Sequence, residues 1–253
     1  MGDIKNFRNG LVVRMPDDFT GVTEALPVLT ALKKIIPEYC GLFIAVPGRF
    51  NQLIRALPIV DAVIPLEKKR AWWSKEEFRM LRQLHAGAVV MLKKSVMECF
   101  LFKAAGIPQI FAFPGSYDAA VSGAGAAVEN MRLPQVVLPC RADELTGGVV
   151  GLFNHPRLMT VIPGADGNIL PEHISMMKKW IDNKGIVVIC GMNQVAGSIW
   201  AQCRKKFRNS CFNFCRNLDI FAQMYTMRFS SEILTDDPGY LKLAELIEPL
   251  RQR

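Results

Sequence analysis

The segment Ile233–Ala244, ILTDDPGYLKLA, combines two acids, a predicted turn and the start of a predicted helix. An apolar run ends in Asp236 and Asp237, and Pro238-Gly239 predicts a turn before a Leu-rich helix. The first turn of a helix presents unsatisfied backbone N–H groups and a partial positive charge, which suit an anion such as phosphate. Ligands of open α/β sheets also bind beyond the carboxyl ends of the strands. The segment therefore fits a phosphate site, and it equally fits an ordinary strand–helix connection with an Asp at the cap.

A dense basic and aromatic segment, KKRAWWSK, spans Lys68–Lys75. Lysine and arginine pair with phosphate or carboxylate groups, and tryptophan suits a sugar face or a membrane interface. Two further lysines follow the predicted strand Ala88–Leu92. The candidate contacts for an anionic ligand are Lys68, Lys69, Arg70, Lys93 and Lys94. The alternative for the segment is a solvated loop with Trp72 or Trp73 folded inward.

The composition is that of a globular α/β protein with a positive surface. The chain has 253 residues and 50% hydrophobic content, enough for one large or two small domains. The net charge of +8 favours anionic partners, and no zinc-finger or RNP-type motif indicates nucleic acid. No apolar run approaches the roughly 18 residues of a membrane span, and the first ten residues lack a hydrophobic signal core. We therefore predict a cytoplasmic protein.

The cysteines do not form a metal motif. Seven are scattered through the chain, and only Cys211 and Cys215 are closely spaced, as CxxxC. A zinc site needs paired cysteines or suitably placed histidines, which the sequence does not offer. We predict buried reduced thiols and no metal.

Predicted strands and helices alternate along the chain, which indicates βαβ units and mainly parallel sheets. The predicted strands are Leu11–Met15, Leu42–Val46, Ala62–Leu66, Ala88–Leu92, Gln109–Phe113, Leu158–Ile162, Ile186–Cys190, Cys211–Cys215 and Glu232–Thr235. The predicted helices are Val22–Ile36, Phe50–Leu57, Lys75–Leu84, Ser95–Ala105, Pro171–Asn183, Gln194–Phe207, Leu218–Phe229 and Leu241–Leu250. The alternation lapses and then restarts, so we predict an N-terminal domain over 1–135, a linker over 136–150 and a C-terminal domain over 151–253.

Several segments, in this order along the chain, resemble one known family. They are EALPVLTALKKIIPE (Glu24–Glu38), KSVMECFLFKAAGIP (Lys94–Pro108), LMTVIPGADG (Leu158–Gly167), IVVICG (Ile186–Gly191) and the Asp-Pro-Gly turn (Asp237–Gly239). The family is the ADP-heptose:lipopolysaccharide heptosyltransferases, glycosyltransferase family 9. The resemblance spans most of the chain, which ends soon after the Asp-Pro-Gly turn, whereas the family continues further.

The resemblance implies two Rossmann-like domains with parallel sheets that face a cleft, the GT-B arrangement. It implies an acceptor-binding N-terminal domain and a shortened C-terminal domain for the nucleotide-sugar. The implied activity is transfer of heptose or a related sugar, with ADP-heptose as donor, to a lipopolysaccharide-core or other glycan acceptor. No metal or other cofactor is implied. An anionic glycolipid acceptor would bring the protein into peripheral contact with the inner face of the membrane.

The chain departs from the family at the catalytic base. The family places an Asp in a Gly-Asp pair at the start of the first helix, and alignment on Pro27 puts Thr20-Gly21 there. A displaced loop could bring in a nearby carboxylate as the base that takes the acceptor proton. The candidates are Asp17, Asp18 and Glu24, and the alternative is that Asp17 and Asp18 only cap the helix.

The chain also departs from the family around the leaving group. The family follows its Pro-Gly-Ala turn with a Lys, which PGADGNILPEH lacks, and Pro238 stands where Thr or Ser is usual. Lys242 replaces the usual His and could supply the missing cation, or it is a solvent-facing helix lysine. The candidate nucleotide-sugar residues are Gly164, Ala165, Gly191, Asp236, Asp237, Gly239 and Lys242. On the acceptor side, Ser95 joins the basic candidates.

These departures leave a second function open. A catalytically degenerate member would keep the fold and bind a nucleotide, glycan or partner protein. A nicotinamide-dependent oxidoreductase is disfavoured, because GAGAAV at Gly123–Val128 lacks the third glycine of a dinucleotide fingerprint and follows no clear strand.

Overall fold

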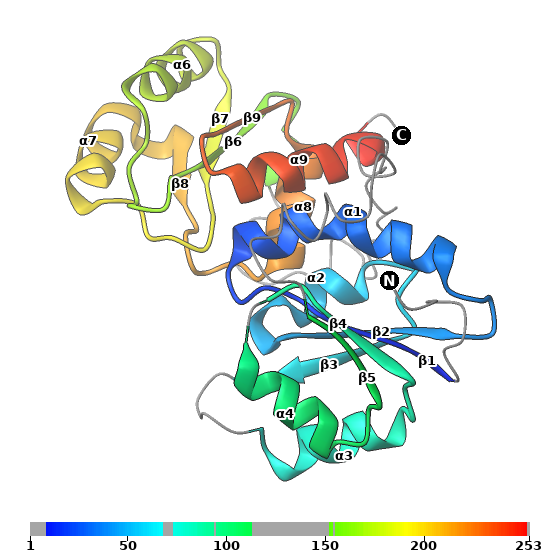
Figure 1. Cartoon of the computed structure of the whole chain (residues 1–253). Helices are drawn as coiled ribbons and strands as arrows, with labels where there is room; N and C mark the ends of the chain where they lie inside the picture. Colours follow the sequence, from blue (N-terminus) through cyan, green and yellow to red (C-terminus); the bar gives the residue numbers. More distant parts are fainter. Residues whose placement is uncertain (1–8, 68–72, 94, 113–151, 154, 252–253) are drawn as a thin grey trace. The chain divides into compact units, whose positions relative to one another are not determined.

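The structure is a computed structural model that describes residues 9–67, 73–93, 95–112, 152–153 and 155–251 (Figure 1). The chain divides into two compact units, Met1–Val137 and Leu138–Arg253. Each unit contains one sheet in which all paired strands are parallel. The α/β fold with two parallel sheets is therefore confirmed. The predicted linker 136–150 and the segment Gly123–Val128 lie outside the described residues.

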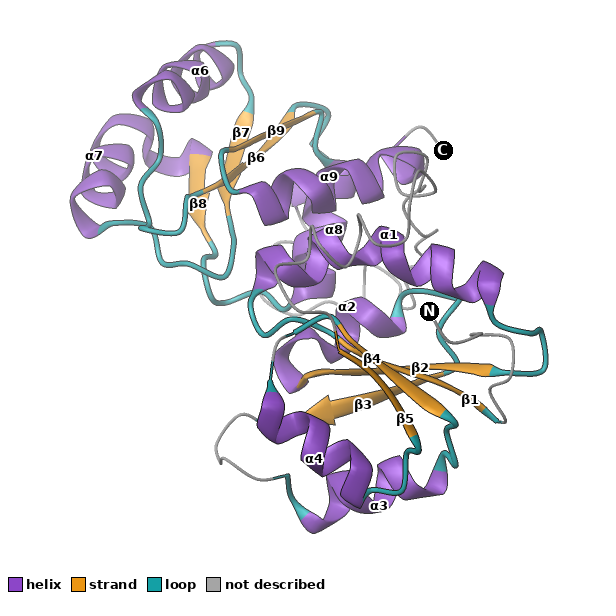
Figure 2. Ribbon diagram, viewed as in Figure 1, coloured by secondary structure: helices purple, strands orange, loops and turns teal. Residues whose placement is uncertain are grey.

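The first unit holds a five-stranded sheet in the order β3-β2-β1-β4-β5. Its strands are β1 (Gly10–Arg14), β2 (Gly41–Pro47), β3 (Ala62–Leu66), β4 (Ala88–Met91) and β5 (Gln109–Ala112). Its helices are α1 (Phe19–Ile35), α2 (Asn51–Arg55), α3 (Lys75–Gln83) and α4 (Val96–Ala104). Helices α1 and α2 cover one face of the sheet, and α3 and α4 cover the other (Figure 2). Strand β1 is the third of the five, so its carboxyl end lies at the middle of the sheet edge. It is buried along its whole length.

The second unit holds a four-stranded sheet in the order β8-β7-β6-β9. Its strands are β6 (Leu158–Ile162), β7 (Ile186–Ile189), β8 (Cys211–Asn213) and β9 (Glu232–Thr235). Its helices are α6 (Pro171–Asp182), α7 (Gly197–Phe207), α8 (Ile220–Phe229) and α9 (Pro238–Arg251). The apolar residues of β6 and β7 pack with those of α6 and α7 in one buried cluster. The six cysteines in the described part of the chain are free, and all but Cys99 are buried.

Side-chain caps begin several of the helices. Asp18 accepts a hydrogen bond from Gly21 N (2.7 Å) at the start of α1, and Asp219 accepts one from Ala222 N (2.8 Å) at the start of α8. Ser74 and Glu77 form a reciprocal capping box at α3. Each cap satisfies backbone N–H groups that the helix itself cannot pair.

The start of α9 corrects the predicted turn. The sequence pattern placed Pro238-Gly239 in a turn and the helix from Leu241, but α9 begins at Pro238. Proline is well suited to the first helical position, because its fixed φ is helical and its missing N–H has no partner there. The Asp-Pro-Gly sequence is therefore a cap followed by the first turn of the helix. In the described part of the chain, no helix is both long and apolar enough to span a membrane.

Tyr240 of α9 ties three segments of the second unit together. Its side chain is 1% exposed. Its hydroxyl accepts a hydrogen bond from Met192 N (2.9 Å) after β7 and donates one to Gln223 Oε1 (2.5 Å) of α8. Gln223 Nε2 in turn donates to Leu218 O (3.0 Å). Burial raises the pKa of Tyr240, so the hydroxyl stays neutral and can keep its donor role.

We expect Tyr240→Phe to lower the free energy of unfolding by about 1–3 kcal/mol, because it leaves the partly buried N–H of Met192 and the buried amide oxygen of Gln223 unsatisfied. Urea unfolding followed by circular dichroism measures this loss. The control is Tyr39→Phe, since Tyr39 is 80% exposed and its variant should keep wild-type stability. Equal stabilities of the two variants would show that the Tyr240 hydroxyl does not hold these segments.

Candidate functional site

A buried arginine organises the carboxyl edge of the first sheet. Arg14 is the last residue of β1, and it is 3% exposed. Its Nε and Nη2 donate to the two carboxylate oxygens of Glu98 on α4, at 2.7 and 2.8 Å. Its Nη2 also donates to Asp17 Oδ1 at 2.7 Å. The bidentate pair with Glu98 gives the guanidinium the close, directed contacts that a buried charge requires.

Lys93 completes the group from the end of β4. Its Nζ donates to Asp17 Oδ2 and, at 3.3 Å, to Glu98 Oε1. Ser95 Oγ accepts from Glu98 N (3.2 Å) and so caps α4 and positions Glu98. We call Arg14, Asp17, Lys93 and Glu98 the four-charge cluster. It lines a cavity of about 190 Å³ together with Ser95, a third acid, Glu67, and the apolar residues Pro47, Leu66, Trp73, Met97 and Leu101.

The four-charge cluster holds Asp17 as a carboxylate. Burial raises the pKa of Asp17, but the hydrogen bonds from Lys93 and Arg14 outweigh burial and lower the pKa to about 2. A carboxylate with so low a pKa is a weak proton acceptor. Any group that drew Lys93 or Arg14 away from Asp17 would raise this pKa and make Asp17 a stronger base.

The other two candidate bases lie outside this cavity. Asp18 is exposed and caps α1, as the alternative interpretation of the sequence stated. Glu24 is exposed on α1. The three predicted carboxylates are therefore not brought together, and Asp17 alone lines the cavity of the four-charge cluster.

Gly21, which the resemblance aligns with the family's base, has no room for a side chain. A Cβ atom at Gly21 would lie 2.7 Å from Pro16 Cβ and 3.1 Å from Asp18 Oδ2. The first contact is closer than Cβ atoms approach in proteins, and the ring of Pro16 cannot rotate away. An Asp here would also face the carboxylate of Asp18.

The corresponding edge of the second sheet is acidic. Gly164 follows β6, and a Cβ atom there would lie 3.3 Å from Asp236 Oδ2 and 3.4 Å from Asp166 Oδ1. Two carboxylates thus flank the turn that contains Gly164 and Ala165. Asp166 accepts from Asn168 N at 2.9 Å, and this hydrogen bond lowers the pKa of Asp166. Negative charge at this turn disfavours a diphosphate unless a cation accompanies it.

The remaining nucleotide-side candidates have structural partners. Asp237 is buried and accepts from Tyr240 N (3.1 Å), which makes it the cap of α9. Lys242 Nζ pairs with Glu245 at 2.7 Å on the surface of the same helix. Gly191 has φ +142 and lies beside Tyr240, where a Cβ atom would be 3.7 Å from the hydroxyl. Gly239 is in the first turn of α9, directly after Pro238.

The basic candidates are only partly described. Lys93 and Ser95 belong to or adjoin the four-charge cluster, whereas Lys68, Lys69, Arg70 and Lys94 lie outside the described residues. Trp73 packs edge-on against Phe102 with ring centroids 4.5 Å apart, so it is folded inward. Among the described residues, no group of three or more His, Cys, Asp or Glu side chains could hold a metal ion.

Sequence reasoning missed Arg14 and Glu98. The available signal was the charge inside the apolar run LVVRM, because an arginine within a buried strand needs an acidic partner. Its partner Glu98 is 84 residues away in sequence, so only the parallel pairing of β1 with β4 brings the two side chains together.

Comparison with known proteins shows what this arrangement resembles. No family model matches the chain, and no curated protein matches it. Among solved structures, ADP-heptose LPS heptosyltransferase II of E. coli matches with a TM-score of 0.72 and 15% identity, covering 94% of this chain and 82% of that one. A glycosyl transferase family 9 structure from Veillonella parvula matches with a TM-score of 0.71 and 13% identity, covering 96% and 78%. The chain has the fold of the GT-B glycosyltransferases.

A third similar structure is E. coli heptosyltransferase WaaC with ADP, at a TM-score of 0.63 and 14% identity, covering 94% of this chain and 84% of that one. Identities this low establish the shared GT-B fold alone. Within that fold, Gly21 lies on α1 of the first unit, and the acidic turn lies beyond β6 and β9 of the second.

We expect Arg14→Met to lower the free energy of unfolding by about 3–5 kcal/mol, because it leaves two partly buried carboxylates without their shared partner. Chemical unfolding at neutral pH measures the loss. Arg55→Met is the matched control, since Arg55 is exposed at the end of α2. A variant of Arg14 as stable as the Arg55 variant would contradict the central place of this guanidinium.

The low pKa of Asp17 predicts an acid-dependent loss of stability. Because the folded pKa lies below the ordinary value of 3.8, Asp17 stabilises the fold above about pH 4, and this contribution disappears as the pH falls towards about 2. Asp17→Asn should therefore reduce the slope of stability against pH in that window. Unfolding curves across this pH range test it, and an unchanged slope would mean that Asp17 is not held by Arg14 and Lys93.

Proposed function

We propose that the chain is a glycosyltransferase-like protein that binds a nucleotide-sugar at the carboxyl edge of its second sheet and a glycan acceptor at the four-charge cluster of its first. The observation that carries the proposal is the position of Asp17. It lies directly after β1, within a cavity that also offers two cations. A carboxylate there can take the proton of an acceptor hydroxyl while Arg14 and Lys93 hold an anionic group of the acceptor.

The proposed donor is an ADP-sugar, and the proposed reaction is transfer of heptose or a related sugar to a lipopolysaccharide-core or other glycan. Two observations support this choice. The segments that resemble the heptosyltransferases occur in family order, and E. coli WaaC, which shares the fold, is a structure with ADP. The positive net charge of the chain favours an anionic acceptor. A cytoplasmic location belongs to the same proposal.

Transfer by this chain should be slow. Asp17 has a pKa of about 2 while Lys93 and Arg14 hold it, and Gly21 leaves no carboxylate at the family's base position. Asp166 and Asp236 also flank the turn where cations would otherwise stabilise the leaving diphosphate. The rate then depends on whether the acceptor withdraws the two cations from Asp17.

The acidic turn supports a second candidate function. The groups nearest to a Cβ atom at Gly164 are two carboxylates, and Lys242 is paired to Glu245 on the surface of α9. Such a protein would bind a nucleoside or glycan, or a partner protein, without transferring a sugar. Nucleotide binding without turnover is the outcome that distinguishes this function from the first.

The test combines titration calorimetry with a transfer assay. Calorimetry with ADP, UDP and GDP identifies the donor base, and radiolabelled ADP-heptose with a lipopolysaccharide-core acceptor measures transfer. We expect Asp17→Asn to lower the transfer rate by about 10²–10⁴-fold, the usual contribution of a general base. Asp18→Asn is the matched control, because asparagine caps a helix as well as aspartate does and the rate should persist.

Each outcome separates the alternatives. Transfer that survives Asp17→Asn but is lost in Asp18→Asn would identify Asp18 as the base and refute the role of Asp17. Nucleotide binding with no detectable transfer would favour the binding function. A folded sample that binds none of the three nucleotides would rule out the transferase.

A further inference from the structure

Two stripes of unlike chemistry run side by side on the α3 and α4 side of the first sheet. Lys75, Arg79 and Arg82 recur at helical spacing on α3, and all three side chains are exposed. On α4, Val96 and Phe100 are 69% and 68% exposed, and Met97 is 45% exposed. We call these six residues the α3–α4 face.

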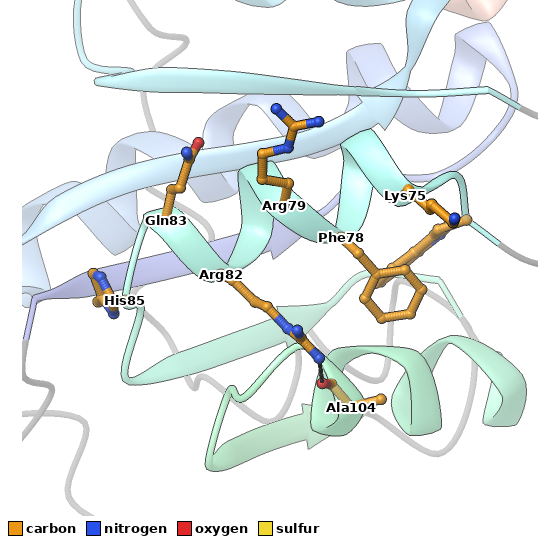
Figure 3. Close-up of a pocket in the computed structure, with 8 residues that line it drawn as sticks. Lys75, Phe78, Arg79, Arg82, Gln83, His85 and Ala104 are labelled. Carbon is orange, nitrogen blue, oxygen red and sulfur yellow. Dashed lines mark hydrogen bonds between the residues drawn. The ribbon is translucent and has the colours of Figure 1, made fainter.

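The two helices are joined at this face. Arg82 Nη2 donates to Ala104 O (3.1 Å) at the end of α4, as the dashed line in Figure 3 shows. Ala104 is one turn beyond Phe100 on the same stripe of α4. The basic stripe of α3 therefore contacts α4 at the C-terminal end of its apolar stripe.

A groove of about 740 Å³ lies along the basic stripe of α3 and reaches α4 at Ala104. Its lining residues are Trp73, Lys75, Phe78, Arg79, Arg82, Gln83, His85 and Ala104. Phe78 and Arg82 project from α3 on the same side of the helix (Figure 3). None of these lining residues is acidic, and Lys75 and Arg79 form no ion pair with another described residue. The groove thus presents cations that are available to an external anion.

We propose that the α3–α4 face docks the protein on an anionic lipid bilayer, with Val96, Met97 and Phe100 entering the interface and Lys75 and Arg79 contacting lipid phosphates. Two features favour a bilayer over a folded protein partner. The apolar side chains of α4 are largely exposed, and the basic stripe lies on the neighbouring helix that Arg82 links to α4. Apolar side chains flanked by lysine and arginine are the composition that binds at membrane interfaces.

The face also adjoins the candidate acceptor cavity. Met97 lines that cavity together with Asp17 and Lys93, and it is at the same time part of the exposed stripe of α4. Docking through this face would bring the mouth of the cavity close to the lipid headgroups. The docking proposal does not depend on sugar transfer, because it concerns the surface of α3 and α4 alone.

A basic groove on the second unit is the alternative site for an anionic membrane. It runs along α7 and is lined by Gly197, Trp200, Ala201, Arg204, Lys205 and Arg208. The large apolar side chains that are exposed in the described part of the chain include none on α7. The α7 groove therefore has the charge but lacks the protruding apolar anchors, and it serves as an internal control.

Vesicle co-sedimentation with the full chain tests the proposal. The probes are vesicles of phosphatidylcholine alone and vesicles in which about one third is phosphatidylglycerol, at low and high salt. We expect binding to the anionic vesicles only, weakened by salt. The double variant Lys75→Glu/Arg79→Glu should weaken this binding by about 25-fold or more, because each basic side chain near an anionic surface contributes about fivefold. Phe100→Ser should weaken it by about tenfold through lost apolar burial.

Matched variants on the second unit supply the controls. Arg204→Glu/Lys205→Glu changes the net charge by the same amount in the α7 groove, and Met176→Ser removes an exposed apolar side chain from α6. Both should keep wild-type vesicle binding. Circular dichroism confirms that every variant is folded. Binding that is lost in the α7 variant but kept in the α3 variant would overturn the proposal. So would wild-type protein that does not bind anionic vesicles, or that binds a protein partner through the α3–α4 face instead.

Discussion

The buried guanidinium of Arg14 is the constraint on which the first unit depends. A charge that is 3% exposed is tolerated only if its hydrogen bonds are filled, and Glu98 and Asp17 fill them. These bonds fix the loop after β1 and the start of α4 against each other across the sheet edge. The cavity beside them therefore has a defined shape, because its polar wall is part of the same network that makes the burial of Arg14 possible.

The charge balance of the four-charge cluster limits how it can bind an anion. Two cations face two carboxylates within hydrogen-bonding distance, so the cluster is neutral as a whole. A neutral cluster attracts a substrate anion only by exchanging partners. Exchange at Lys93 is easier than at Arg14, because the Lys93 side chain is 30% exposed and that of Arg14 is 3% exposed. The second sheet differs, since the described groups nearest to Gly164 in its turn are the carboxylates of Asp236 and Asp166.

Much of the fold could be predicted from the sequence, and the errors have physical causes. The strands Ala62–Leu66, Leu158–Ile162 and Glu232–Thr235 have the predicted bounds, because short apolar runs between turn residues admit little else. The start of α9 was wrong, since Pro-Gly is common in turns and yet also fits a helix start. At the site, Asp17 and Lys93 were predicted singly. Their contacts with Glu98 depend on the pairing of β1 with β4, which local sequence patterns do not encode.

The contact between Gly21 and Pro16 has a consequence for how this chain can change by mutation. A carboxylate at residue 21 would collide with the Pro16 ring 2.7 Å away, so Gly21→Asp alone damages the start of α1. Replacing Pro16 removes this contact, but the carboxylate of Asp18 still lies 3.1 Å from the same Cβ position. An aspartate at residue 21 is thus compatible with the start of α1 only after residue 16 has changed. A carboxylate at residue 21 therefore requires more than one substitution, and a combinatorial library that varies the neighbouring positions together is the way to obtain it.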